Sequence, residues 1–210
     1  MRTPRSRIAI EAKLETNGRT FTAPPLRMPR FDRTWTLFLD RDGVLNKEKP
    51  GGGYITSWEE FVFIEGVLEA LRVLAQIFGR IVVVTNQRGV GKGYVSEAAL
   101  QVIHRRLQGV VAAAGGRIDA IYACTDAAED APCRKPNPGL ALQAKRDFPE
   151  IDFHHSVMVG NSPSDMEFGR ALGMYTVWIA PNLETPAPGR VDEVHTSLWG
   201  WAQTLDQRQR

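Results

Sequence analysis

Short runs of apolar residues alternate with segments of helical periodicity along most of this chain. The run from Ile81 to Val84 is wholly β-branched, which is typical of a strand buried on both faces of a sheet. A helical repeat of apolar residues, from Val67 to Phe78, precedes it. This alternation predicts an α/β fold with a parallel sheet and helices on both of its faces. The expected strands are Trp35 to Leu39, Ile81 to Val84, Ile118 to Ala123, Val157 to Val159 and Tyr175 to Ile179.

The first 33 residues differ from the rest in pattern and in charge. Residues 8–14 alternate apolar and polar side chains, Asn17-Gly18 is a dipeptide favoured in tight turns, and residues 19–23 can return as a second strand. The segment up to Arg33 holds eight basic residues against three acidic ones, so its net charge is positive. The rest of the chain has more acidic than basic residues and is net negative. We expect a β-hairpin extension with a linker at residues 1–33 and one domain at residues 34–210.

Composition indicates a globular protein, with 43% hydrophobic and 24% charged residues. No apolar run is long enough to span a bilayer, and the basic start from Met1 to Arg7 lacks the apolar block of a secretory signal. We therefore expect a cytoplasmic protein with no membrane partner. Only Cys124 and Cys133 are present, which is not a disulfide framework, and in a reducing compartment we expect free thiols or metal ligands.

Polar side chains follow several of the expected strands. Asp40 and Asp42 come after the first strand of the domain, and because they are two residues apart they project to the same side of an extended segment. Thr85 and Asn86 end the next strand. The carboxyl ends of parallel strands meet at one sheet edge, where ligands bind in open α/β sheets. Further polar residues in the loops fed by later strands are Arg134, Lys135, Asn161 and Asp165.

Two neighbouring carboxylates repel each other unless a cation lies between them. Mg²⁺ is the expected cation because it takes oxygen ligands and keeps several waters. A phosphate group would complete its coordination, and the ammonium of Lys135 would neutralise charge as an anionic nucleophile approaches an anionic phosphate. The candidate metal ligands are Asp40, Asp42, Asn161 and Asp165, and the candidate phosphate ligands are the hydroxyl of Thr85, the amide of Asn86 and the cation of Lys135.

Four motifs, in order and at regular spacing, resemble those of the haloacid dehalogenase (HAD) superfamily of phosphatases. They begin at Asp40 (DRDGVLN), Thr85 (TNQRGVGKG), Cys133 (CRKPNPG) and Gly160 (GNSPSD). Their variants are most similar to the histidinol-phosphate and heptose-bisphosphate phosphatase branch. The likeness covers Trp35 to Ala180 and implies a HAD-like, Rossmann-like fold. Each interval between the first three motifs has room for only one loop, one helix and one strand, so we expect a capless fold.

The resemblance implies a Mg²⁺-dependent phosphatase that acts on a small phosphorylated metabolite, such as heptose bisphosphate or histidinol phosphate. Asp40 would attack phosphorus and form a phosphoaspartate. Asp42 would protonate the leaving oxygen and then deprotonate the hydrolytic water. Lys135 and Thr85 would hold the transferred group, and Arg134 would hold a second anion or another part of the substrate. Mg²⁺ would bind Asp40, the main-chain carbonyl of Asp42, Asn161 and Asp165.

The sequence departs from the pattern of this branch at two places. The branch often holds a structural zinc with a Cys-x-His and a Cys-x-Cys pair, where this chain has Cys124-Thr-Asp126 and Ala131-Pro-Cys133. Two thiolates and one carboxylate do not make a closed tetrahedral site, so the sequence predicts no structural zinc. Asn161 stands where the family usually has an aspartate. Its amide oxygen can still ligate Mg²⁺ but carries no charge, so we expect weaker metal binding.

Two alternative functions come from weaker signals. Thr85 to Gly93 resembles the same loop of polynucleotide 3′-phosphatases, and the basic N-terminal segment would suit a nucleic-acid end. The sequence has no aromatic-rich stacking surface, so nucleic acid is not the partner that we expect. If Asn161 prevented turnover, the chain would be a non-catalytic phosphate-binding module. The loops expected to select the substrate are Lys47 to Thr56, Gln87 to Tyr94 and Cys124 to Lys135.

Overall fold

The computed structural model describes residues 15–16, 19–20, 29–183 and 191–209. They fall into two compact units, Met1–Arg30 and Phe31–Arg210. Phe31 is buried, and its ring centroid lies 5.5 Å from that of Phe78 and 6.1 Å from that of Trp201. The hydrophobic core of the second unit therefore begins at this residue.

A short antiparallel pair of strands forms in the first unit. β1 (Glu15–Thr16) and β2 (Arg19–Thr20) are hydrogen-bonded neighbours, and Asn17 and Gly18 are the two residues between them. This pair is the part of the predicted β-hairpin that the structure describes. The other residues of the two predicted strands, 8–14 and 21–23, lie outside the described residues.

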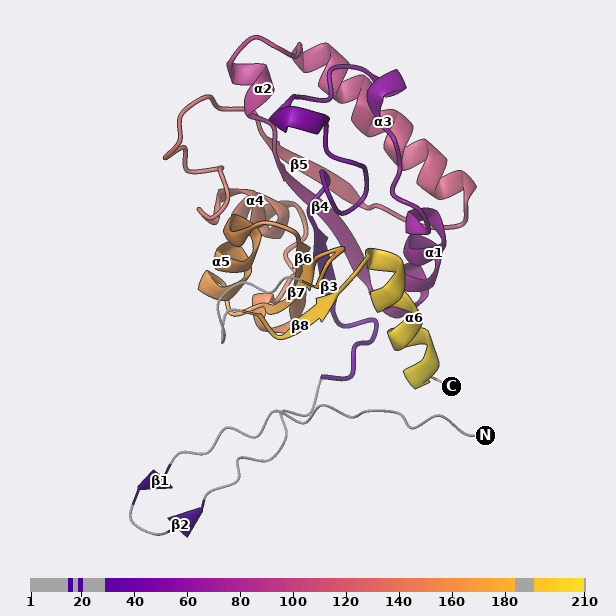
Figure 1. Ribbon diagram of the computed structural model, residues 1–210, viewed down its shortest axis with the longest axis vertical. Helices are drawn as coiled ribbons and strands as arrows, with labels where there is room; N and C mark the ends of the chain where they lie inside the picture. Colours follow the sequence, from indigo (N-terminus) through magenta and orange to yellow (C-terminus); the bar gives the residue numbers. More distant parts are fainter. Residues whose placement is uncertain (1–14, 17–18, 21–28, 184–190, 210) are drawn as a thin grey trace. The chain divides into compact units, whose positions relative to one another are not determined.

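A parallel sheet of six strands forms the centre of the second unit in the described residues (Figure 1). The strands are β3 (Thr36–Leu39), β4 (Arg80–Asn86), β5 (Ala120–Cys124), β6 (Ser156–Gly160), β7 (Tyr175–Ile179) and β8 (Glu193–His195). Their order is β5-β4-β3-β6-β7-β8, so β3, which is buried along its whole length, lies between β4 and β6. The predicted parallel sheet is confirmed. β8 was not predicted because its three residues contain no apolar run.

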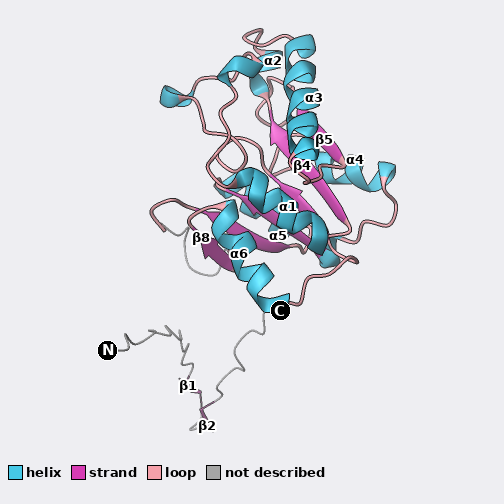
Figure 2. Ribbon diagram, turned by 90° about the vertical axis from the view of Figure 1, so that its right-hand side faces the viewer, coloured by secondary structure: helices cyan, strands magenta, loops and turns pink. Residues whose placement is uncertain are grey.

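Helices cover both faces of this sheet. They are α1 (Val67–Ile77), α2 (Arg88–Gly91), α3 (Glu97–Ala113), α4 (Gly139–Asp147), α5 (Pro163–Ala171) and α6 (Leu198–Gln209), with short 3-10 turns at Pro50–Gly52, Trp58–Glu60 and Phe153–His155. Leu37 and Leu39 join the core under α1, α3 and α6, whereas Phe38 joins the core under α4 and α5. Figure 1 shows the two groups of helices on opposite sides of the strands, and Figure 2 looks onto α1 and α6.

Local sequence explains where the helices beside the site begin. The Ser96 hydroxyl accepts a hydrogen bond from the Ala99 N–H, which caps α3 as the sequence predicts. Ser162 and Asp165 form a reciprocal capping box at the start of α5. In the described residues, the chain between β3 and β5 holds only loops, short turns, α1, β4, α2 and α3, with no separate cap domain. No helix in the described ranges has the length and apolar character needed to cross a membrane.

Candidate active site

The predicted site residues gather at the carboxyl edge of the three central strands. Leu39 is in register with Val83 of β4 and Val159 of β6, so the residues that follow these positions leave the sheet side by side. The N–H of Asp40 continues the ladder and donates to the Val159 carbonyl at 2.9 Å. Parallel pairing therefore brings Asp40, Thr85 and the loop after β6 to one place.

Lys135 is the buried cation at the centre of this site. Its Nζ donates to Asp40 Oδ1 at 2.7 Å and to Asp165 Oδ1 at 2.5 Å. Burial on its own would lower the pKa of Lys135, but the two carboxylates outweigh burial and raise the pKa, so the ammonium stays protonated. Burial raises the pKa of Asp40 to about 7, helped by the charge of Asp165 and opposed by Lys135. Two carboxylates thus share one cation, which leaves this buried cluster with excess negative charge.

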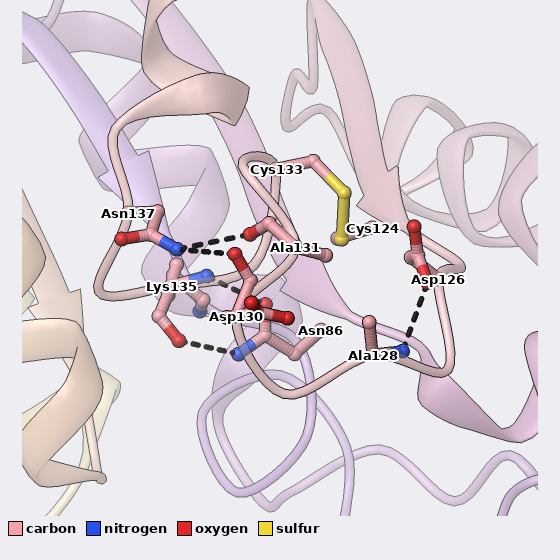
Figure 3. The surroundings of a disulfide bond; sticks show 9 residues. All are labelled: Asn86, Cys124, Asp126, Ala128, Asp130, Ala131, Cys133, Lys135 and Asn137. Carbon is pink, nitrogen blue, oxygen red and sulfur yellow. Dashed lines mark hydrogen bonds between the residues drawn. A yellow bond between two sulfur atoms is a disulfide. The ribbon is translucent and has the colours of Figure 1, made fainter.

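The Asn86 side chain holds the main chain of Lys135. Its Nδ2 donates to the Lys135 carbonyl at 3.1 Å, and its Oδ1 accepts from the Lys135 N–H at 2.9 Å (Figure 3). These two bonds connect the end of β4 to the loop that carries the cation. The sequence suggested the main-chain amide of Asn86 as a phosphate ligand but gave no sign of this side-chain role, because the two residues are 49 positions apart.

Asp42 lies in a separate network of hydrogen bonds. Arg41 Nη2 donates to both Asp42 carboxylate oxygens, each at 3.0 Å, while Asn46 Nδ2 and Gln87 Nε2 each donate at 2.8 Å. Burial alone would raise the pKa of Asp42, but the Arg41 charge and these hydrogen bonds hold it below its ordinary value. Arg41 is fully buried, and its Nη1 lies 3.2 Å from His104 Nε2. No individual role for the three partners of Asp42 or for His104 was evident from the sequence.

Gln87 connects the Asp42 network to Thr85. Its Nε2 donates to Asp42 Oδ2 at 2.8 Å and to Thr85 Oγ1 at 2.9 Å. The Thr85 hydroxyl is buried, and because it accepts this bond it keeps its own proton to donate to a ligand oxygen. The predicted phosphate-binding hydroxyl and the predicted acid/base carboxylate are therefore oriented by the same amide.

Both oxygens of Asp165 have protein partners. Oδ1 accepts from Lys135, and Oδ2 accepts from the Ser162 hydroxyl at 2.7 Å, from the Ser162 N–H at 3.0 Å and from the Asn161 N–H at 3.2 Å. A Cβ on Gly160 would lie 2.3 Å from the Asp165 Cβ, so only glycine fits there. Asp165 is thus fixed at the start of α5, where it holds Lys135.

Asn161 has one bonded and one unbonded side-chain atom. Its Nδ2 donates to Glu48 Oε1 at 2.8 Å, whereas its buried Oδ1 accepts no hydrogen bond from the described residues. A buried amide oxygen without a donor, at the same sheet edge as Asp40, fits a hard cation such as Mg²⁺. The described residues hold no cluster of three or more His, Cys, Asp or Glu side chains arranged for a metal. A metal here would therefore need amide and main-chain oxygens as well as carboxylates.

Arg134 adds a second cation next to Lys135 in the chain. Its N–H donates to the Ala131 carbonyl at 2.9 Å, which fixes the turn before Lys135. Its Nη1 is buried and has no hydrogen-bond partner in the described part of the chain. A guanidinium nitrogen that is buried without a partner can donate to an anionic ligand.

The two cysteines form a disulfide, so the expectation of free thiols or metal ligands is wrong. Cys124 ends β5, and Cys133 directly precedes Arg134 (Figure 3). The intervening loop folds back until the two Cα atoms are 5.3 Å apart, which is within the range that a disulfide spans. The spacing of nine residues did not reveal this approach. The prediction of no structural zinc is not tested by this finding and stays a prediction.

Comparisons with known proteins agree with this geometry. Residues 36–174 match the protein family described as "Polynucleotide kinase 3 phosphatase". A D-glycero-alpha-D-manno-heptose-1,7-bisphosphate 7-phosphatase of Mycobacterium bovis is 42% identical over 139 residues, which cover 66% of this chain and 73% of that protein. A D-glycero-beta-D-manno-heptose-1,7-bisphosphate 7-phosphatase of Escherichia coli K12 is 32% identical over 185 residues, which cover 83% of this chain and 95% of that protein.

A solved structure is also similar. It is a D,D-heptose 1.7-bisphosphate phosphatase from B. bronchiseptica, complexed with magnesium and phosphate. It has a TM-score of 0.73 and 28% sequence identity, and the match covers 83% of this chain and 99% of that one. Fold and sequence therefore indicate the same relatives.

Proposed function

Because the chain belongs to the polynucleotide kinase 3 phosphatase family of the haloacid dehalogenase superfamily, in the branch of the heptose bisphosphate phosphatases, we propose that it removes one phosphate group from a sugar bisphosphate. The chain is a phosphatase. The observation that carries the proposed mechanism is the Lys135 ammonium between the Asp40 and Asp165 carboxylates at the carboxyl edge of the sheet. This arrangement places a nucleophile and a cation for the transferred group within hydrogen-bonding distance.

Asp40 is the proposed nucleophile. It attacks phosphorus, the bond between phosphorus and the leaving oxygen breaks, and a phosphoaspartate forms. Lys135 lies 2.7 Å from its Oδ1, so the ammonium can also contact an oxygen of the phosphoryl group that Asp40 receives. That contact stabilises the charge which develops in the transition state.

Asp42 is the proposed acid and base. It gives a proton to the leaving oxygen and later takes one from the water that hydrolyses the phosphoaspartate. Arg41 donates to both of its oxygens, and Gln87 donates to one of them. The Gln87 amide donates to both Thr85 and Asp42, so the group that orients the phosphate-binding hydroxyl also orients the acid/base carboxylate.

Mg²⁺ is the proposed cofactor, and the residues present fit it through the unbonded Asn161 oxygen and the excess negative charge of Asp40 and Asp165. The proposed ligands are the Asp40 carboxylate, the main-chain carbonyl of Asp42 and Asn161. The remaining predicted ligand, Asp165, already has both oxygens engaged, so we assign it to holding Lys135. When bound, the ion supplies positive charge that lets the anionic nucleophile approach the phosphate.

A sugar bisphosphate is favoured over histidinol phosphate for two reasons. The Mycobacterium bovis and Escherichia coli relatives described above are heptose bisphosphate phosphatases by name. The buried Nη1 of Arg134 has no hydrogen-bond partner among the described residues, and it can receive the second phosphate of a bisphosphate while Lys135 holds the first. Histidinol phosphate would leave this cation without an anion.

Phosphate release from a substrate panel tests the proposal. The panel contains sugar bisphosphates, sugar monophosphates, histidinol phosphate and nucleotides. We expect Mg²⁺-dependent release that is fastest with a sugar bisphosphate and is abolished by Asp40→Asn. Asp152→Asn is the matched control, since Asp152 is an exposed aspartate near the start of β6, at the opposite edge of the sheet. Release that persists in Asp40→Asn, or a panel in which no bisphosphate is cleaved, contradicts the proposal.

A second candidate substrate is a 3′-phosphorylated nucleic-acid end. The structure stacks Tyr54 and Tyr94, with ring centroids 5.3 Å apart, and Tyr94 is 65% exposed. This aromatic surface was not evident in the sequence, since the rings come from two separate loops. A base could stack on it while the terminal phosphate is cleaved. Adding 3′-phosphorylated oligonucleotides to the panel, with Tyr94→Ala as the variant, distinguishes the two substrates: only cleavage of the oligonucleotide should depend on the ring.

A further inference from the structure

The Asn161 amide is oriented by a residue far away in the sequence. Its Nδ2 donates to Glu48 Oε1 at 2.8 Å, across 113 positions of the chain. A carboxylate can only accept hydrogen bonds, so the amide must present nitrogen to Glu48 and oxygen to its other side. That oxygen is the buried Oδ1 without a hydrogen-bond partner in the described residues. One contact therefore determines which Asn161 atom is available to a ligand.

Gly43 provides the space for this contact. A Cβ at Gly43 would lie 2.1 Å from Asn161 Nδ2 and 2.9 Å from Glu48 Oε1, closer than atoms can approach. Gly43 also has a φ of +82°, which favours glycine in its own right. The Asn161 side chain thus packs on the peptide that follows Asp42, whose main-chain carbonyl is a proposed metal ligand.

The negative charge of Glu48 is not taken up by the neighbouring Lys49. That lysine pairs with Glu60 at 2.6 Å, in the turn Trp58–Glu60. Glu48 and Asn161 both line a hollow of about 460 Å³ that opens to solvent. A carboxylate hydrogen-bonded to the nitrogen of an amide polarises it and makes its oxygen a better ligand.

We propose that Glu48 is a positioning residue for Mg²⁺. It holds Asn161 with the amide oxygen toward the metal and supplies, one hydrogen bond further out, the negative charge that the family's usual aspartate would carry. The inference rests on the proposed function, because it assigns Asn161 to the metal. Residues that orient metal ligands in this way typically contribute 10- to 100-fold to metal affinity.

The pair also explains why this chain has an asparagine at position 161. An aspartate there would place a second carboxylate within about 3 Å of Glu48, and like charges at that distance strongly disfavour each other's ionised form. The amide instead gives Glu48 a donor. Glu48 and Asn161 therefore form one unit, in which the charge and the ligand oxygen come from different residues.

Titration with Mg²⁺ alone tests the role of Glu48. Calorimetry on the full chain, without substrate, gives the dissociation constant for wild type and for Glu48→Ala and Glu48→Gln. We expect roughly 10-fold weaker binding for the alanine variant and a smaller loss for the glutamine variant, which keeps an acceptor but loses the charge. Glu65→Gln is the matched control, since Glu65 is an exposed glutamate between the turn Trp58–Glu60 and α1. An affinity that does not change in Glu48→Ala overturns the proposal.

A double-mutant cycle tests the pairing itself. Asn161→Asp is made in the wild-type background and in Glu48→Gln. The new carboxylate should improve Mg²⁺ affinity by several-fold more in Glu48→Gln, because the repulsion from Glu48 is removed there. A merely structural contact would give the same change in both backgrounds, and that result overturns the proposal. The shift in melting temperature caused by Mg²⁺ is a second readout of the same cycle.

Phosphate release, measured separately on the same proteins, separates this inference from the proposed function. Coupling between positions 48 and 161 in Mg²⁺ binding, without release from any substrate, would refute the proposed function and support the role of Glu48. An active wild type whose Mg²⁺ affinity is independent of Glu48 would refute only the role of Glu48.

Discussion

Asp40 and Asp42 are two residues apart, yet the structure pairs them with cations of different origin. Asp42 is held by Nη2 of Arg41, its neighbour in the chain. The Nη1 atom of the same guanidinium group contacts His104 on α3. Asp40 is held by Lys135, which is 95 residues away and lies in a loop fixed by the disulfide and by Asn86. One ion pair is local, and the other exists only because distant segments fold together.

The surroundings of Asp40 and Asp42 shift the pKa values of the two carboxyl groups in opposite directions. Burial raises the pKa of Asp40 to about 7, whereas Arg41 and neighbouring amides hold the pKa of Asp42 below its ordinary value despite burial. The proposed reaction needs the reverse order, with Asp40 ionised as the nucleophile and Asp42 protonated as the acid. A divalent cation beside Asp40 lowers its pKa, and a phosphate dianion near Asp42 raises its pKa. Binding of cation and substrate would therefore set both protonation states.

Removing the distant cation should have the largest effect. Lys135→Met leaves Asp40 and Asp165 buried without their partner, so we expect the free energy of unfolding to fall by about 3–5 kcal/mol and phosphatase activity to disappear. Without Lys135 the folded-state pKa of Asp40 rises further, because the cation no longer opposes the effect of burial, so the loss should be smaller at acidic pH, where Asp40 protonates. Urea unfolding at neutral and acidic pH measures this, with exposed Lys92→Met as the control. A loss that grows on acidification would contradict the assignment.

Opening the disulfide should weaken the same distant pair indirectly. Closing a loop of this length stabilises a protein by about 2–3 kcal/mol, so Cys133→Ser should lower the unfolding free energy by that amount. Activity should fall too, because the loop carrying Lys135 becomes less constrained. A thiol reductant should reproduce both effects in wild type and leave the variant unchanged. Insensitivity of wild type to the reductant would show that the bond is not formed in solution.

Removing the local cation should have a smaller effect on stability than removing the distant one. Arg41→Met takes away charged hydrogen bonds worth about 2 kcal/mol to the partly exposed Asp42, whose pKa then rises because burial is less opposed. The turnover rate should fall by roughly 100-fold, as expected for a mispositioned acid/base group. Arg106→Met, an exposed arginine on α3, is the control. Unfolding and steady-state kinetics on both variants decide whether the local pair is functional or merely structural.

The smallest predicted effect concerns His104, which supports Arg41. Burial, with the charge of Arg41, lowers the His104 pKa from 6.5 to about 4, against the opposite influence of Asp42. Between those values the unfolded chain binds a proton that the folded protein does not, so acidification destabilises the fold. The contribution from pH 7 to pH 5 is roughly 1–2 kcal/mol. His104→Gln keeps a neutral acceptor for Arg41 and should flatten the pH dependence of stability over this interval. An unchanged slope in the variant would show that His104 is not the group responsible.

Much of the fold and the position of the site could be predicted from local pattern. Ile81–Val84 indicated a fully buried strand, and the apolar repeat from Val67 to Phe78 indicated a helix, because periodicity involves residues within one turn or one strand. The predicted loops do converge at one sheet edge, because the carboxyl ends of parallel strands all lie at the same edge of the sheet. Strand β8 was missed because pairing to β7, and not composition, makes it a strand.

The partners within the site could not be predicted in the same way. The prediction for Asn86 concerned its main-chain amide, and nothing in the sequence indicated that its side chain holds the Lys135 main chain. Glu48 was placed in a substrate-selecting loop, with no sign of its contact with Asn161. The cysteines were expected to stay apart or to bind metal, yet they bond to each other. Each of these contacts depends on the path of a loop in the folded protein, and a short sequence motif does not predict that path.

Local patterns were enough to predict five strands of the parallel sheet, the four motifs and the two carboxylates at a strand end, because these depend on backbone geometry over a few residues. Only the folded molecule shows which cation pairs with which carboxylate and which Asn161 atom is available to a ligand. Burial and long-range approach set those outcomes, and both are properties of the packed core. The DRDGVLN motif thus supplies two similar carboxylates, and their surroundings make them different.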